Sequence, residues 1–368
     1  MTESRDEIKK DLKYFFLVVL ALTLIGFIFI YSSSSVYALE KFGSSFYFIK
    51  KQILYLIPAI LSFIVFAILP ENFLKKIVFF LFFISLFLTA LTLSPDMGLK
   101  MHGSSRWLNI AGFSFQPSEF LKLFLFLYIG FFLEKKRKKV KSFLHSYLPF
   151  LIILGITFIV LLKQPDFGSV ATIFATALVI FFVANFSLIH LGVTFLISLP
   201  VIVYLIYSKA YRLNRILIFL NPWSDPQGSG FQIIQSLIAI GSGQLWGVGI
   251  SNSAQKFFYL PMQHTDFIFP IIAEETGLVG SLIIISLYLL FFYFGLRLAL
   301  KMQTDFAFFA TLGFVVLTSL QAVVNLMVAC GLLPTKGLGL PFISYGGTSL
   351  VALYCMLGLI ANFSRWES

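Results

Sequence analysis

Three carboxylates stand in a part of this apolar chain that has few other acidic residues. Asp266 lies at the start of an apolar segment, in the sequence H-T-D-F-I-F, and Glu274 and Glu275 follow eight and nine residues later. An ionisable side chain at membrane depth costs about 2.5–3.5 kcal/mol on insertion scales, so these groups are candidates for function. A carboxylate held there can accept a proton from a reacting hydroxyl. The alternative for Asp266 is capping of the helix expected to begin near Phe267, because Asp is favoured at helix N-caps.

Cations in the neighbouring polar segments form a second group of candidates. Arg212 and Arg215 are three residues apart and therefore share a helical face, whereas Arg106, Lys256 and Lys336 come from other segments. Arg binds phosphate through two parallel hydrogen bonds and Lys binds it as a point charge. As a set that converges with Asp266, these side chains are typical of a pyrophosphate site. The alternative for each one is a side chain that extends its charge to the membrane interface.

The elements that carry these residues are those of a polytopic helical membrane protein. Of the 368 residues, 59% are hydrophobic and 12% are charged, and the mean hydropathy is +0.94. Apolar runs near the ~20 residues that cross a bilayer recur along the chain. We predict an all-α fold of about ten transmembrane helices in a single domain, 1–368. The predicted spans are 14–34, 46–69, 74–94, 117–134, 146–163, 168–184, 187–208, 268–296, 305–329 and 344–363.

Basic residues set the predicted orientation. The run from Glu134 to Lys141 holds six Lys and Arg residues between two apolar segments, which is typical of a cytoplasmic loop that meets anionic membrane lipid. These cations do not alternate with aromatic residues on a soluble face, so we expect no nucleic-acid partner. The N-terminal tail 1–13 and the C-terminus are predicted to be cytoplasmic. The large loop 209–267, between the seventh and eighth helices, is predicted to be extracytoplasmic, and all motif-rich segments then open to the outer face.

Several motifs occur in the predicted outer segments and extend into the adjoining spans. They read G-S-S-R-W-L-N with Q-P-S-E-F-L-K, Q-P-D-F-G-S, R-I-L-I-F-L-N-P-W with D-P-Q-G-S-G-F-Q, Q-S-L-I-A-I-G-S-G, Y-L-P-M-Q-H-T-D-F-I-F and L-P-F-I-S-Y-G-G. In this order they resemble the SEDS family of shape, elongation, division and sporulation proteins, which includes FtsW and RodA. The segments S-A-Q-K-F-F-Y-L-P and P-T-K-G-L, with Lys256 and Lys336, are more similar to the cell-division branch, FtsW, than to the elongation branch.

The resemblance implies a peptidoglycan glycosyltransferase that polymerises lipid II into glycan strands in septal cell-wall synthesis. It implies an inverting reaction with Asp266 as the general base and the outer cations on the pyrophosphate of the donor. It also implies a class B penicillin-binding transpeptidase and other division proteins as partners, at the septum in the bacterial cytoplasmic membrane. One alternative is a flippase or transporter of the lipid-linked precursor, although the inner halves of most predicted spans carry no carboxylate. Another is a scaffold for division proteins.

Acidic residues near the candidate base are predicted to support it. Glu119 would lie in the first turn of a span that begins at Pro117, where it can pair with Lys122; its alternative role is to complement the helix dipole. Glu274 is about two helical turns beyond Asp266 and is predicted to line the same cavity.

Three polar residues, His264, Gln235 and Ser344, are predicted to contact the substrate. The alternative for the segment that begins at Ser344 is helix packing through small residues. The four His are too scattered for a zinc site. The sequence requires no cofactor, and a divalent cation that bridges the pyrophosphate and a carboxylate is kept as an alternative.

Overall fold

The computed structural model describes residues 2–95, 98–101, 104–110, 113–256 and 263–366. Residues 257–262, which carry parts of two of the motifs above, lie outside the described residues, as do Met1 and Gly103. The first half of the chain forms α1 Thr2–Phe42, α2 Tyr47–Ile68, α3 Glu71–Leu91, β1 Gly98–Met101, β2 Ser104–Ile110, β3 Phe113–Phe115, α4 Pro117–Lys136, α5 Leu148–Lys163 and α6 Phe167–Val183. The second half forms α7 Leu188–Tyr207, α8 Ala210–Leu220, α9 Phe231–Ser242, α10 Ile268–Leu300, α11 Asp305–Ala329 and α12 Gly347–Trp366.

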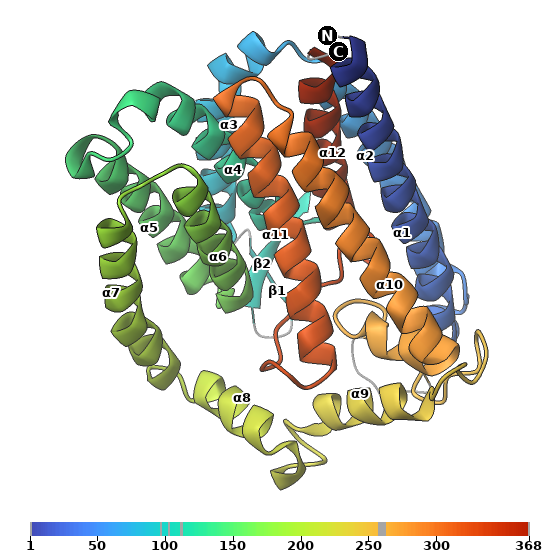
Figure 1. Ribbon diagram of the computed structural model, residues 1–368. Coiled ribbons are helices and arrows are strands. Elements are labelled where there is room, and N and C mark those ends of the chain that lie inside the picture. Colours follow the sequence, from blue (N-terminus) through green and yellow to red (C-terminus); the bar gives the residue numbers. More distant parts are fainter. Residues whose placement is uncertain (1, 96–97, 102–103, 111–112, 257–262, 367–368) are drawn as a thin grey trace.

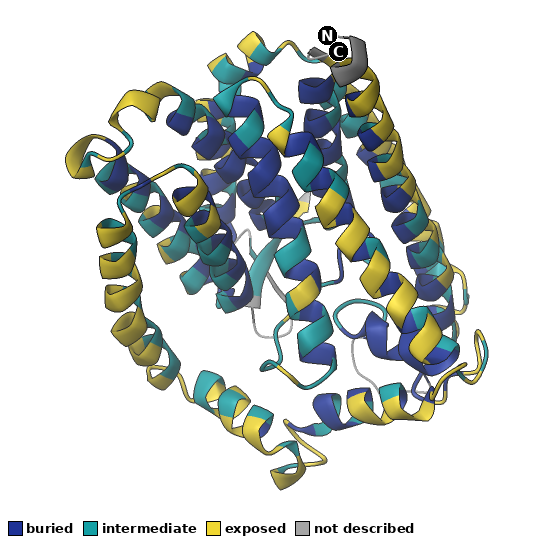
Figure 2. Cartoon of the chain, viewed as in Figure 1, coloured by how far each residue is buried: buried dark blue, intermediate teal, exposed yellow. Residues whose placement is uncertain are grey.

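The long helices form a bundle in which α4, α11 and α12 are the most enclosed. The buried faces of these three helices contribute much of the core, whereas α7 has no buried residue and stands at the edge of the bundle (Figures 1 and 2). Both termini lie at one end of the bundle, and α8 and α9 lie at the other (Figure 1). The start of α1 and the end of α12 therefore lie at the same end of the bundle. The cytoplasmic placement of both termini stays a prediction.

The predicted all-α membrane fold is confirmed. Within the described residues, eight helices are long and apolar enough to cross a membrane. Two further predicted spans, α4 and α6, are not among them: α6 has only 17 residues, and α4 carries several charged side chains. The large loop 209–267 contains the short helices α8 and α9.

The cytoplasmic placement of the tail 1–13 stays a prediction, and the structure shows that α1 is helical from Thr2 onward. Its buried Asp11 pairs with Arg297 at 3.1 Å and with Lys301 at 2.8 Å. These ion pairs connect the start of α1 to the end of α10. Helix α1 extends beyond residue 34, the predicted end of the first span, to Phe42. The serines that follow Tyr31 remain helical; Ser34 Oγ, for example, donates to the Ile30 carbonyl at 2.6 Å.

A three-stranded antiparallel sheet, in the order β1-β2-β3, lies in a segment predicted only as an outer loop. Trp107 and Ile110 on β2 are typical strand residues, but the apolar stretch is too short for its pattern to predict a strand. Residues of β2 contact α4. Strand β2 carries Arg106, one of the predicted site residues.

Helix α10 is interrupted at Gly277, whose φ and ψ are 66° and −160°. The segment 244–249 packs against this break. Its Val248 and Gly249 amides donate to the Glu274 and Glu275 carbonyls at 3.0 Å, and its carbonyls accept from Leu278 and Val279. Unpaired peptide groups are costly in a membrane, so these bonds allow the helix to break there.

Replacement of Gly277 by Ala should therefore destabilise the protein. The residue has a positive φ, and an added Cβ would lie 2.5 Å from the Gly247 nitrogen. Backbone strain of this kind costs on the order of 1–3 kcal/mol before the clash is counted, and we expect a clearly lower melting temperature in detergent. Gly155→Ala on α5 is the matched control, because nothing lies within 4 Å of its added Cβ and Ala favours helix. Equal melting temperatures for the two variants would contradict the prediction.

Candidate active site

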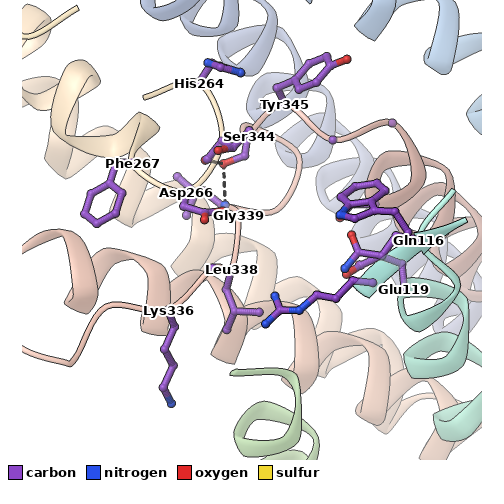
Figure 3. A pocket seen from close by; sticks show the side chains of 18 of the residues that line it. Gln116, Glu119, His264, Asp266, Phe267, Lys336, Leu338, Gly339, Ser344 and Tyr345 are labelled. Atoms are coloured by element: carbon purple, nitrogen blue, oxygen red, sulfur yellow. Dashed lines mark hydrogen bonds between the residues drawn. The ribbon is translucent and has the colours of Figure 1, made fainter. Parts of the chain in front are cut away.

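A cavity of about 1140 Å³ opens between the central helices and the loops at their ends. It is lined by side chains from β2, the starts of α4 and α6, the segment before α10 and the segment between α11 and α12. Figure 3 shows Gln116 and Glu119 across the cavity from Asp266 and Ser344. The predicted site residues that line it are Arg106, Glu119, Arg215, His264, Asp266, Lys336 and Ser344.

Asp266 does not cap α10. The helix begins at Ile268, its N-cap is Phe267, and no side chain accepts a capping hydrogen bond there. The capping alternative is therefore wrong, and the carboxyl group faces the cavity. Burial raises the pKa of Asp266 to about 6, with Asp166 acting in the same direction and Arg106 and Arg215 opposing them.

Arg106 lies opposite Asp266 and is held by the turn between α5 and α6. Its Nε donates to the Gln164 carbonyl at 3.2 Å and its Nη2 to the Pro165 carbonyl at 2.7 Å. A Cβ added at Gly337 would lie 3.2 Å from Asp266 Oδ2 and 3.8 Å from Arg106 Nη1. The carboxyl group and the guanidinium thus approach the same point of the loop, and glycine leaves room for both.

Two more cations reach the cavity. Arg215 on α8 donates to the Thr335 carbonyl at 3.1 Å, which connects α8 to the loop that carries Lys336. Burial lowers the pKa of Lys336, and Asp166 opposes this effect. Its Nζ lies 5.8 Å from the centre of the Phe167 ring. These positive groups on one side of the cavity suit an anionic ligand.

Glu119 and Lys122 form the predicted i,i+3 pair, with Nζ 2.8 Å from Oε1. Pro117 occupies the first turn of α4 as predicted. Glu119 lines the cavity, whereas the Lys122 side chain is only 2% exposed and also donates to Gln321 Oε1 at 3.4 Å. The pair therefore connects the cavity wall to α11.

Besides Lys122, four predicted residues are not among those that line the cavity. Lys256 donates to the Ser251 carbonyl and is buried, Arg212 donates to the Leu205 carbonyl at 2.7 Å, and Gln235 lies on α9. Glu274 binds Ser253 Oγ and the Ala254 amide instead. The helical spacing used for Glu274 does not apply, because Asp266 precedes the first residue of α10.

Asp166 and Gln232 are among the lining residues that the sequence did not single out. Asp166 is 2% exposed, caps α6 through Ser169 and lies 3.8 Å from Arg106 Nη1. The signal was present in Q-P-D-F-G-S, since the argument that singled out Asp266 applies equally to this carboxylate. Gln232, one turn before Gln235 on α9, lies in D-P-Q-G-S-G-F-Q and lines the cavity; its spacing from Gln235 gave no means of choosing between them.

His264 belongs to an aromatic wall of the cavity. Its ring centre lies 4.3 Å from that of Phe48 and 5.8 Å from that of Tyr345. Burial lowers the pKa of His264 to about 4, so the imidazole is neutral at pH 7. Among the described residues, no group of three His, Cys, Asp or Glu side chains is arranged to hold a metal ion, and the divalent-cation alternative stays a prediction.

Comparison with known proteins identifies the family. The model of the FtsW, RodA and SpoVE family, described as cell cycle proteins, matches residues 12–368. The chain belongs to this family. A probable peptidoglycan glycosyltransferase FtsW of Geobacter sp. strain M18 is 41% identical over 348 residues, which are 95% of each chain. Stage V sporulation protein E of Bacillus subtilis is 39% identical over 95% of this chain and 96% of its own.

Solved structures of the family share the fold. A chain from a structure described as "Structural coordination of polymerization and crosslinking by a peptidoglycan synthase complex" is 31% identical, with a TM-score of 0.78 and coverage of 96% and 97%. The rod shape determining protein RodA of Thermus thermophilus is 26% identical, with a TM-score of 0.71 and 95% of each chain covered. The resemblance predicted from the motifs is thus confirmed, and this FtsW/RodA/SpoVE chain is a multi-pass membrane protein.

Proposed function

We propose that this chain is a peptidoglycan glycosyltransferase that polymerises lipid II into glycan strands. The single observation that carries the proposal is the cavity in which the partly buried Asp266 faces Arg106, Arg215 and Lys336. A carboxyl group with a raised pKa beside several cations is the arrangement expected where a base meets a diphosphate. The names of the relatives point to the same activity.

The chemistry follows from these groups. A sugar hydroxyl must lose its proton as it attacks the anomeric carbon of the donor, and Asp266 is the proposed acceptor of that proton. The bond from that carbon to the lipid diphosphate breaks, and cations stabilise the departing negative charge. Because the diphosphate is already a good leaving group, a pair of carboxylates like that of glycosidases is not required. Because the hydroxyl displaces the lipid diphosphate in a single step, the configuration at the anomeric carbon is inverted.

The proposed setting is the bacterial cytoplasmic membrane at the septum. We assign the cavity to its outer face, where lipid II would enter from the membrane. The proposed partner is a class B penicillin-binding transpeptidase, together with other division proteins. The likeness to a chain from a complex that couples polymerisation and crosslinking supports such a partner.

The test is polymerisation of purified lipid II in liposomes by the full chain together with its transpeptidase, whose own crosslinking site is blocked. Glycan strands are the expected product. Transfer of lipid II across the bilayer without strands would replace the proposal with a flippase. Neither product, from a complex shown to be folded and assembled, would favour a scaffold.

The rate of polymerisation should rise with pH through about 6. Asp266 can accept a proton only as the carboxylate, and burial raises its pKa to about 6. Below that value the rate should fall about tenfold per pH unit, and above pH 7 it should be level. His264, with a pKa of about 4, contributes no change between pH 5 and 8. Arg106→Met removes a cation that lowers the Asp266 pKa, so its midpoint should move upward; an unchanged midpoint would contradict this account.

A further inference from the structure

The backbone immediately before α10 is held at three consecutive carbonyls. The Tyr345 amide donates to the His264 carbonyl at 2.9 Å, Ser344 Oγ donates to the Thr265 carbonyl at 2.5 Å, and Asn325 Nδ2 donates to the Asp266 carbonyl at 2.8 Å. All three donors come from the last quarter of the chain. The segment that carries the proposed base is therefore fixed by hydrogen bonds from outside α10.

Asn325 differs from the other two donors because it binds a second segment as well. Its Nδ2 also donates to the Leu338 carbonyl at 2.6 Å. Both partners are carbonyl oxygens, so the amide nitrogen must face them. Asn325 is 3% exposed, and its Oδ1 has no hydrogen-bond partner among the described residues. A buried acceptor left unpaired costs free energy. The contribution of this side chain to the structure is therefore its two donated hydrogen bonds.

Gln321 continues the same contact one turn earlier on α11. Its Nε2 donates to the Gly339 carbonyl at 3.0 Å, next to the carbonyl that Asn325 binds. Its Oε1 accepts from Lys122, which pairs with Glu119. Positions four residues apart share a helical face. One face of α11 thus touches the Lys336 loop and the Asp266 segment, and reaches α4 through Lys122.

We propose that Asn325 is a positioning residue, which holds the Asp266 segment and the loop bearing Lys336 side by side at the wall of the cavity. The inference rests on the proposed function and adds a residue to it. Asn325 is not among the residues that line the cavity, so it acts through the backbone of Asp266. A displacement of about 1 Å at a reacting group can lower a rate about 100-fold. Loss of Asn325 should therefore lower kcat and leave substrate binding nearly intact.

The test compares Asn325→Leu with wild type in the full complex, measuring kcat and KM for lipid II. We expect kcat to fall about 10- to 100-fold and KM to change less than about twofold. Asn362→Leu is the matched control, since Asn362 Nδ2 also donates to two carbonyls, of Phe66 at 2.8 Å and Leu69 at 2.5 Å. Like Asn325 it is buried and has an unpartnered Oδ1, but its partners are at the end of α2 away from the cavity.

Melting temperatures of both variants separate positioning from stability. Similar losses of stability, with kcat reduced only in Asn325→Leu, would support the proposal. Equal kcat per folded molecule in the two variants would overturn it. If Asn325→Leu does not fold, Asn325→Ser, which retains a hydroxyl donor, should fold with a smaller loss of kcat; wild-type kcat in that variant, or failure of both to fold, would make Asn325 a purely structural residue. An inactive wild-type complex would refute the proposed function instead.

Discussion

Asp266→Asn is expected to abolish most glycan synthesis, with a loss of roughly 10²- to 10⁴-fold in kcat, the usual contribution of a general base. The amide has nearly the same shape as the carboxyl group but cannot accept a proton at neutral pH. The hydrogen bond from Asn325 goes to the backbone carbonyl of Asp266, so it survives the substitution. Binding of lipid II should therefore persist while turnover is lost. The measurement is the rate of strand formation at saturating lipid II.

The control for this experiment is Asp305→Asn. Asp305 begins α11, pairs with Arg137 at 3.0 Å and is not among the residues that line the cavity. Its loss removes a carboxylate of the same type and should leave turnover unchanged. If the folded Asp266→Asn variant formed glycan strands at the wild-type rate, Asp266 would not be the general base.

Lys122→Met should cause a large loss of stability. Its side chain is 2% exposed, and its ammonium group pairs with Glu119 at 2.8 Å. Removal of one partner leaves a poorly solvated charge, which typically costs about 3–5 kcal/mol. The measurement is the melting temperature of the full complex in detergent.

A second substitution separates this effect from loss of packing. Glu119→Gln combined with Lys122→Met removes the orphaned charge and should restore much of the lost stability. Arg137→Met is the exposed counterpart, because the Arg137 side chain is 75% exposed and surface pairs contribute about 0–1 kcal/mol. A double variant as unstable as Lys122→Met would show that the buried charge is not the cause.

Features that depend on neighbouring residues could be predicted from the sequence. Apolar runs of membrane length gave most of the helices, Pro117 marked the start of α4, and the i,i+3 spacing gave the ion pair between Glu119 and Lys122. Each depends on helical periodicity within one segment, and that periodicity is a property of the local chain. The motifs also indicated the family, which the comparisons confirmed.

The sequence also singled out most of the charged residues of the cavity, because charges are rare in so apolar a chain. It did not decide which of them meet. Glu274 binds the Ser253 segment, and helical spacing does not relate it to Asp266 because Asp266 precedes the first residue of α10. Asp166 reaches Arg106 because a short sheet and the turn before α6 bring distant segments together.

The tertiary structure alone assigned Asn325 its partners. In the sequence it is one polar residue in an apolar span, and nothing in its spacing connects it to Asp266, 59 residues earlier. The bonds to the Asp266 and Leu338 carbonyls depend on how α11 packs against two loops. Local periodicity determines which residues share a face of a helix, but only the packing of helices determines what that face touches.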